Sequence, residues 1–183
     1  MNEKPNECLI KKKSIFWVLV AIISALYVVL IILIPIAWEI PQVRVADSLF
    51  TTVFFFGIPG SIGIALGCVI ANFIGGLGII DIVFGSLANL IAGIIGYFLY
   101  KKIKDTEGKI KHLYIQLIIL LMNLINTFIV GTYLPFLLSM PLIPISFWMT
   151  YLGIFTGSLI SMNILGYLLF ISLEKAGIQK YWL

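Results

Sequence analysis

One uncharged stretch, from residue 113 to residue 173, constrains the fold of this chain more than any other feature. It contains no Asp, Glu, Lys, Arg or His, whereas soluble domains carry a charge at about a quarter of their residues. The whole chain is similar, with 183 residues, 61% of them hydrophobic and 11% charged, and a mean hydropathy of +1.13. Apolar runs of this length match the roughly 20 residues of a spanning helix, so the sequence predicts an all-α integral membrane protein.

Prolines, glycines and charges divide the chain into six predicted transmembrane helices. From residue 48 to residue 80 there is no charge, but a single helix there would be roughly 50 Å long, too long for a ~30 Å hydrocarbon core. A break at Gly57–Gly60 therefore separates two short helices, and we expect the first to be tilted or partly enclosed by protein. Pro135, Pro141 and Pro144 are expected to divide the last uncharged stretch. The predicted helices cover residues 14–34, 45–56, 59–74, 79–100, 113–134 and 149–172.

The lysines predict the orientation. All eleven fall in segments that six crossings place on one side of the membrane, and basic loops are normally cytoplasmic. We therefore expect both termini to be cytoplasmic and the net charge of +4 to reflect orientation, with no nucleic-acid partner. This divides the chain into an N-terminal tail (1–13), a transmembrane domain (14–173) with a cytoplasmic loop at about 101–112, and a C-terminal tail (174–183).

Three charges do not fit this pattern, because they lie near the predicted outer ends of helices. Arg44 and Asp47 are three residues apart and share a helix face, so they either neutralise each other or face a polar ligand, and both can hold if a ligand competes for the pair. Asp81 falls in the first turn of its helix, where a carboxylate can cap free amides or bind a ligand. Ionisable side chains within a membrane domain indicate a functional site. The three charges therefore predict a site for a polar small molecule that arrives from outside.

Amide side chains extend the set of candidates. Asn123, Asn126 and Thr127 share one face of a predicted helix, and hydrogen bonding between helices is the ordinary role of such residues. Asn126 lies in the outer half of its helix and is the best placed of these to meet a ligand; Asn72 is a further candidate. Amides with carboxylates suit a ligand that has donor and acceptor edges, such as a nucleobase or an amino-acid-like compound.

Small residues mark close helix contacts. Gly63 and Gly67 belong to a ridge in the third helix, which is a close-packing device. Ala21 and Ala25 form a small patch on the first helix. Inside the monomer this patch would be ordinary packing, and on a lipid-facing side it would be a docking surface for another membrane protein.

The sequence lacks the motifs of several kinds of enzyme and metal site. The sequence has no phosphate-binding Gly-x-x-x-x-Gly-Lys-[Ser/Thr] loop, no His-Glu-x-x-His and no Cys-x-x-Cys. The single histidine, in the predicted 101–112 loop, leaves no Ser-His-Asp set. Cys8 and Cys68 differ too much in setting to predict a disulfide or a metal site. We therefore expect neither an enzyme nor a bound cofactor or metal.

Three segments resemble the QueT family: residues 42–49 (QVRVADSL), 67–72 (GCVIAN) and 78–88 (GIIDIVFGSLA). Members of that family are substrate-binding S components of energy-coupling factor (ECF) transporters, assigned to queuosine precursors. Asn126 with Val130 and Gly131, and Gly157 near Gly166, also resemble family positions. Two residues depart from the family pattern. Asp47 stands where the family usually has glutamate, and Ser158 follows Gly157 where the family commonly has Gly-Glu.

The resemblance implies a function in uptake. The chain would capture a deazaguanine-type precursor from outside, and a separate transmembrane scaffold with two cytoplasmic ATPases would drive its release inward. Ala21 and Ala25 would meet the scaffold. Aromatic side chains such as Phe54, Phe84 or Trp148 would stack on the ligand. The polar contacts expected are Arg44, Asp47, Asp81 and Asn126, followed by Asn72 and Ser158.

Other functions stay open from the sequence. The chain could be an S component for another vitamin-like compound. It could be a stand-alone secondary transporter that uses Asp47 or Asp81 as a proton site, or a membrane scaffold that transports nothing.

Overall fold

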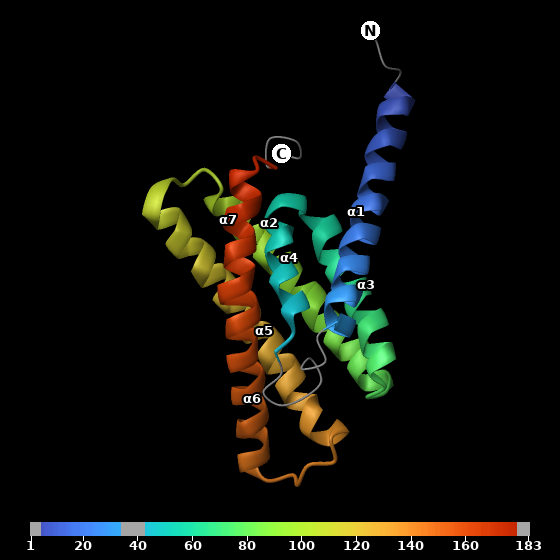
Figure 1. Cartoon of the computed structure of the whole chain (residues 1–183), viewed down its shortest axis with the longest axis vertical. Helices are drawn as coiled ribbons and strands as arrows, with labels where there is room; N and C mark the ends of the chain where they lie inside the picture. The colour runs from blue at the N-terminus through green and yellow to red at the C-terminus, as the bar shows by residue number, and fades with distance from the viewer. Residues whose placement is uncertain (1–4, 34–42, 179–183) are drawn as a thin grey trace.

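The computed structural model describes residues 5–33, of which 5–12 as backbone only, and residues 43–178. Over these ranges it is helical and has no strand, as predicted (Figure 1). Segment η2 is a 3₁₀-helix, and η3 and η4 are π-helices. The elements are α1 (Pro5–Leu33), η2 (Val45–Thr52), α2 (Val53–Phe56), α3 (Ile58–Gly75), η3 (Asp81–Gly85), α4 (Ser86–Ile103), α5 (Gly108–Leu137), α6 (Pro144–Ser158), η4 (Leu159–Gly166) and α7 (Tyr167–Lys175).

Five helical stretches are long and apolar enough to cross a membrane, and a sixth is shorter. The shorter one, Val45–Phe56, consists of η2 and α2. It contacts α1 and α3 as well as η4 and α7, and its residues from Ala46 to Phe55 are buried. The predicted second helix is therefore confirmed in its bounds and in its enclosure by protein. The long stretches are Lys13–Leu33, Ile58–Gly75, Asp81–Ile103, Gly108–Leu137 and Pro144–Lys175.

The structure corrects the predicted boundaries in four places: the start of the first helix, the 101–112 loop, the end of the fifth helix and the start of the sixth, which was predicted at residue 149. Helix α1 begins at Pro5, within the segment predicted to be a polar tail. The predicted 101–112 loop shrinks to residues 104–107, because α4 and α5 continue to either side of it. Pro135 does not end α5, which runs on to Leu137; a proline so close to a helix end removes only one of the last hydrogen bonds. Pro144 starts α6, where its missing N–H costs nothing.

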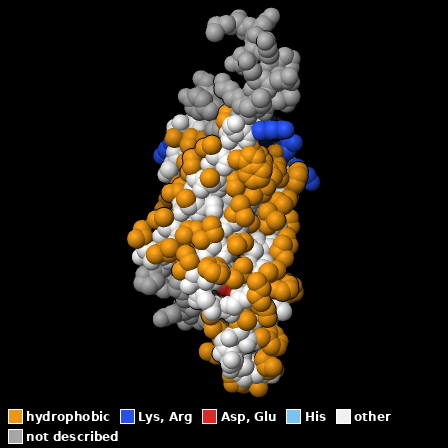
Figure 2. Space-filling model, turned by 90° about the vertical axis from the view of Figure 1, so that its right-hand side faces the viewer, with side chains coloured by type: hydrophobic (Ala, Val, Ile, Leu, Met, Phe, Trp, Pro, Cys, Tyr) orange, Lys and Arg blue, Asp and Glu red, His pale blue; other side chains and the backbone are white. Residues whose placement is uncertain are grey.

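The lysine-bearing segments share one end of the bundle. The start of α1, the 104–107 connection and the end of α7 lie together at the top of Figure 1. Figure 2 shows Lys and Arg side chains toward this end and a largely hydrophobic surface along the molecule. This placement agrees with the positive-inside pattern, and the compartment on each side stays a prediction.

Helices α1 and α3 pack closely through the predicted ridge of small residues. A Cβ atom on Gly67 would lie 2.6 Å from Cβ of Tyr27, and one on Gly63 would lie 2.8 Å from Cβ of Ile23. In lipid such van der Waals packing replaces the hydrophobic effect as the force between helices. The ridge therefore brings Tyr27 of α1 directly against α3.

We expect Gly67→Ala to destabilise the bundle by about 1–3 kcal/mol, because the added methyl group overpacks the contact with Tyr27. The measurement is the melting temperature of the detergent-purified protein. Phe73→Ala, at an α3 position that is 74% exposed, should leave it nearly unchanged. An unchanged or higher melting temperature for Gly67→Ala would contradict the close contact.

Candidate functional site

The 3₁₀ geometry of η2 sets up the first two charged residues. The Thr51 and Thr52 hydroxyls donate hydrogen bonds to carbonyl groups three residues earlier, at 3.1 and 2.6 Å. The Asp47 amide donates to the Arg44 carbonyl in the same register, at 2.9 Å. Asp47 lies in the first turn of η2, whereas Arg44 precedes the helix as its N-cap residue with an extended backbone. The hydrogen bond between their backbones holds the two residues next to each other, but the predicted shared helix face does not extend to Arg44.

Asp47 is held by a tyrosine from α1. The Tyr27 hydroxyl donates to Asp47 Oδ1 at 2.8 Å and accepts a hydrogen bond from Asn89 Nδ2 of α4 at 3.2 Å. All three side chains are at most 2% exposed. The hydroxyl therefore joins η2 to α4 across the interior of the bundle.

Arg44 and Asp81 are joined through an amide of α3. Arg44 Nη2 donates to Asn72 Oδ1 at 3.3 Å, and Asn72 Nδ2 donates to the Asp81 backbone carbonyl at 2.9 Å. The Tyr133 hydroxyl of α5 donates to Asp81 Oδ1 at 2.7 Å. The structure thus brings together Arg44, Asp47, Asp81 and Asn72, four of the six predicted site residues.

Gly85 leaves the space in which Asn72 and Tyr133 approach Asp81. A Cβ atom at this position would lie 2.6 Å from Asn72 Nδ2 and 3.1 Å from the Tyr133 hydroxyl. Gly85 ends the π-helix η3, which begins with Asp81, and π-helical turns are frequent at functional sites. A side chain here would separate Asn72 from Asp81.

These side chains form one site, which we call the polar cluster. It connects α1, η2, α3, η3, α4 and α5, and its charged members are at most 5% exposed. Each buried charge costs several kcal/mol unless well paired, so a cluster of this kind in a membrane domain indicates a function. The polar cluster consists of Tyr27, Arg44, Asp47, Asn72, Asp81, Asn89 and Tyr133.

Two buried acceptor atoms at or near the cluster have no hydrogen-bond partner among the described residues. They are Asp81 Oδ2 and Asn126 Oδ1. Asn126 is seven residues before Tyr133 on α5, two turns along the same helix face. A buried acceptor left without a donor costs about 1–3 kcal/mol. Both atoms would be satisfied by N–H groups of a ligand.

The structure decides between several alternatives from the sequence. Asp81 lies in the first turn of η3, as predicted, where a carboxylate offsets the helix dipole. Its Oδ1 atom accepts a hydrogen bond from the Tyr133 hydroxyl, and a ligand-binding role stays a prediction. Asn123 donates to the Phe155 carbonyl of α6 at 3.4 Å and accepts from Thr127 at 3.0 Å, which confirms hydrogen bonding between helices. Ser158 is buried at the last position of α6 and, like Asn126, lies outside the hydrogen bonds of the polar cluster.

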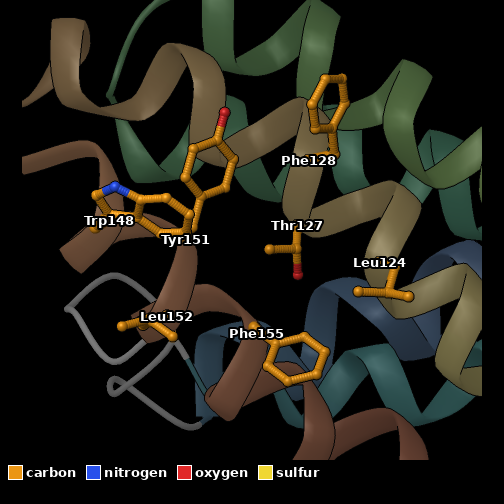
Figure 3. Close-up of a pocket in the computed structure, with 7 residues that line it drawn as sticks. All are labelled: Leu124, Thr127, Phe128, Trp148, Tyr151, Leu152 and Phe155. Atoms are coloured by element: carbon orange, nitrogen blue, oxygen red, sulfur yellow. The ribbon is translucent and has the colours of Figure 1, made fainter. Parts of the chain in front are cut away.

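Most of the aromatic residues expected to stack on a ligand lie away from the polar cluster. Phe54 stacks on Tyr100 with ring centroids 4.8 Å apart. Phe84 is 49% exposed, and its ring lies 6.1 Å from that of Tyr133, which is its one link to the polar cluster. Trp148 is 64% exposed and lines an apolar groove of about 570 Å³ between α5 and α6 (Figure 3).

Ala21 and Ala25 are exposed on α1. Together with Trp17 and Leu66 they line a second apolar groove of about 570 Å³, between α1 and α3. The patch is thus on the outer surface and is not buried against other helices of the monomer.

Sequence reasoning missed four contributors to the site. Tyr27 is in the middle of an apolar helix, whereas membrane tyrosines favour the interfaces, and that position was a usable signal. Tyr133 lies near a helix end and resembles an interfacial anchor. Asn89 is an amide within an apolar helix, a kind of residue that usually bonds neighbouring helices, and Gly85 belongs to the 78–88 segment without a separate signal of its own. Their roles depend on contacts between segments distant in sequence.

The helical fold and the polar cluster together indicate the class of protein to which this chain belongs. An all-helical, multi-pass membrane protein with a buried cluster of charges and amides has the construction of a transport protein. The sequence model of the family described as "QueT transporter" matches residues 17–175. This chain therefore belongs to the QueT transporter family, and the resemblance found in the sequence is confirmed. Comparisons with curated proteins and with solved structures gave no match.

We expect Tyr27→Phe to lower the stability of the protein by about 2 kcal/mol, because it leaves the Asp47 carboxylate and the Asn89 amide without their shared hydroxyl. The melting temperature in detergent reports this loss. Tyr114→Phe, at a position that is 43% exposed, makes the same chemical change outside the cluster and should have little effect. Equal melting temperatures for the two variants would contradict a structural role for the Tyr27 hydroxyl.

Proposed function

We propose that this chain is the substrate-binding S component of an ECF-type importer and that it captures a queuosine precursor of the deazaguanine type. The proposal rests on membership of the QueT transporter family. The observation that carries it within the structure is the polar cluster with its unpartnered acceptor, Asp81 Oδ2. A deazaguanine offers N–H groups on one edge, which match carboxylate and amide acceptors.

The charges of the cluster favour such a ligand. One guanidinium, Arg44, accompanies two carboxylates, Asp47 and Asp81, and all three are buried. A ligand that donates hydrogen bonds, or carries a positive charge, offsets the excess of acceptors. Because Asp47 and Asp81 already have tyrosine partners, binding would exchange or extend these hydrogen bonds. Different affinities of the ligand for outward- and inward-facing states would then couple binding to transport.

The ligand and the role of Asp81 can be tested together. A panel of deazaguanines, guanine and unrelated vitamins is added to the purified protein, and melting temperature and affinity are measured. We expect a deazaguanine to raise the melting temperature and Asp81→Asn to weaken its binding tenfold or more, since a charge-assisted hydrogen bond contributes about 1.5–3 kcal/mol.

Asp105→Asn is the matched control, because Asp105 is exposed in the 104–107 connection. No shift with any deazaguanine would refute the substrate. A shift with unchanged affinity in Asp81→Asn would make Asp81 structural. Asp47→Asn tests the second carboxylate in the same way.

The partners proposed are a transmembrane scaffold and two cytoplasmic ATPase subunits. The chain has no phosphate-binding loop of its own, so ATP-driven uptake needs such subunits. The exposed Ala21 and Ala25, at the base of the groove between α1 and α3, permit close approach of another helix. We place the scaffold contact there.

We expect Ala25→Leu to reduce copurification of the scaffold about tenfold, because a larger side chain holds the facing helix away. Ligand binding by the isolated protein should not change. Thr156→Leu, a similar enlargement at an exposed position of α6, is the control. Full retention of the scaffold by Ala25→Leu would exclude this docking surface.

Reconstitution in liposomes distinguishes an S component from a stand-alone transporter. Liposomes that contain the chain alone, with a proton gradient, are compared with liposomes that also contain the scaffold and ATPases with ATP. Uptake only in the second case supports the S component. Uptake driven by the proton gradient alone would favour proton-coupled transport through Asp47 or Asp81.

A further inference from the structure

A third groove lies between α4 and α5, at the end of the bundle that carries the lysines. It has a volume of about 260 Å³. Ile118, which is 7% exposed, lies deepest, while Leu117 and Leu121 are 50% and 40% exposed. Seven residues separate Tyr114 from Leu121, about 10 Å along the helix axis. The groove is therefore a short apolar channel parallel to two helices that are long enough to span the membrane.

The close contact of the two helices explains why the groove forms. A Cβ atom on Gly96 would overlap Sδ of Met122, so α4 and α5 pack closely at this pair. Of the groove residues, Leu121 directly precedes Met122, and Leu99 follows Gly96 by three residues, about one helical turn. From there the helices continue to their 104–107 connection, and the apolar channel opens beside it.

The open end of the groove is basic. Lys102 is one of its lining residues and is exposed, as is the neighbouring Lys101. Lys104, Asp105 and Glu107 are exposed on the 104–107 connection, and Lys109 is exposed at the start of α5. Lys111 is paired with Glu174 at 2.6 Å and adds no net charge. The remaining charges leave this end positive beside an apolar channel.

We propose that this groove binds an anionic glycerophospholipid, with an acyl chain along Leu117 and Leu121 and the phosphate at Lys102. The helices on both sides are membrane spans, so hydrocarbon surrounds the channel. Basic pockets between transmembrane helices bind anionic headgroups. This site is separate from the polar cluster and does not depend on the transported substrate.

Native mass spectrometry of the purified protein tests the proposal. Dioleoyl-phosphatidylglycerol and dioleoyl-phosphatidylcholine are titrated in parallel, and the bound fractions give the affinities. We expect tighter binding of phosphatidylglycerol, and about fivefold weaker binding of this lipid to Lys102→Gln, the effect of one lysine at a membrane surface. Leu117→Trp, which fills the channel, should also weaken it.

The control variants use the same changes elsewhere. Lys13→Gln removes an exposed lysine of α1, and Leu168→Trp enlarges a residue of α7 that is 56% exposed; both should bind phosphatidylglycerol like the unchanged protein. Equal binding of the two lipids would overturn the proposal. So would equal losses in Lys102→Gln and Lys13→Gln, or displacement of the lipid by glycerol phosphate at similar concentration, because an acyl chain would then contribute nothing.

Discussion

Polar groups within hydrocarbon must find their hydrogen-bond partners inside the protein, and the structure is arranged around this requirement. Arg44, Asp47 and Asp81 each make a hydrogen bond to a side chain from another element: Asn72 of α3, Tyr27 of α1 and Tyr133 of α5. Of the buried polar atoms of these three side chains, only Asp81 Oδ2 is left without a partner among the described residues. The short helix that carries Asp47 therefore lies inside the bundle rather than against lipid. The longer helices then form its apolar enclosure.

Departures from regular α-helix adjust this arrangement. The 3₁₀-helix η2, which follows the extended N-cap residue Arg44, carries Asp47 in its first turn, and the π-helix η3 begins with Asp81. Two glycines leave space for neighbouring side chains because they have no side chain of their own: Gly67 packs against Tyr27, and Gly85 packs against Asn72. Helix α1 has two roles, because Tyr27 on its inner face contacts the polar cluster and Ala25, half a turn earlier, is exposed on its outer face. Ligand and scaffold would thus act on the same helix from opposite sides.

The two proposed binding sites lie at opposite ends of the bundle and differ in their chemistry. The polar cluster lies toward one end of the bundle, next to the turn between α3 and η3. The lysines and the groove at Lys102 lie at the other. A polar substrate and an anionic lipid would therefore bind without competing, since one needs buried acceptors and the other exposed cations beside hydrocarbon.

The sequence by itself determined the helical membrane class, the enclosed short helix at 45–56 and the presence of the charges Arg44, Asp47 and Asp81 within the membrane domain, because hydropathy and the positions of charges are local properties. It did not determine the partners of these charges. Tyr27 and Asn89 are 62 residues apart in sequence but meet at 3.2 Å, and Pro135 sits within α5 although a proline normally ends a helix. Only the tertiary structure decided these features, since hydrogen bonds between helices depend on how the helices pack and not on the periodicity of any one segment.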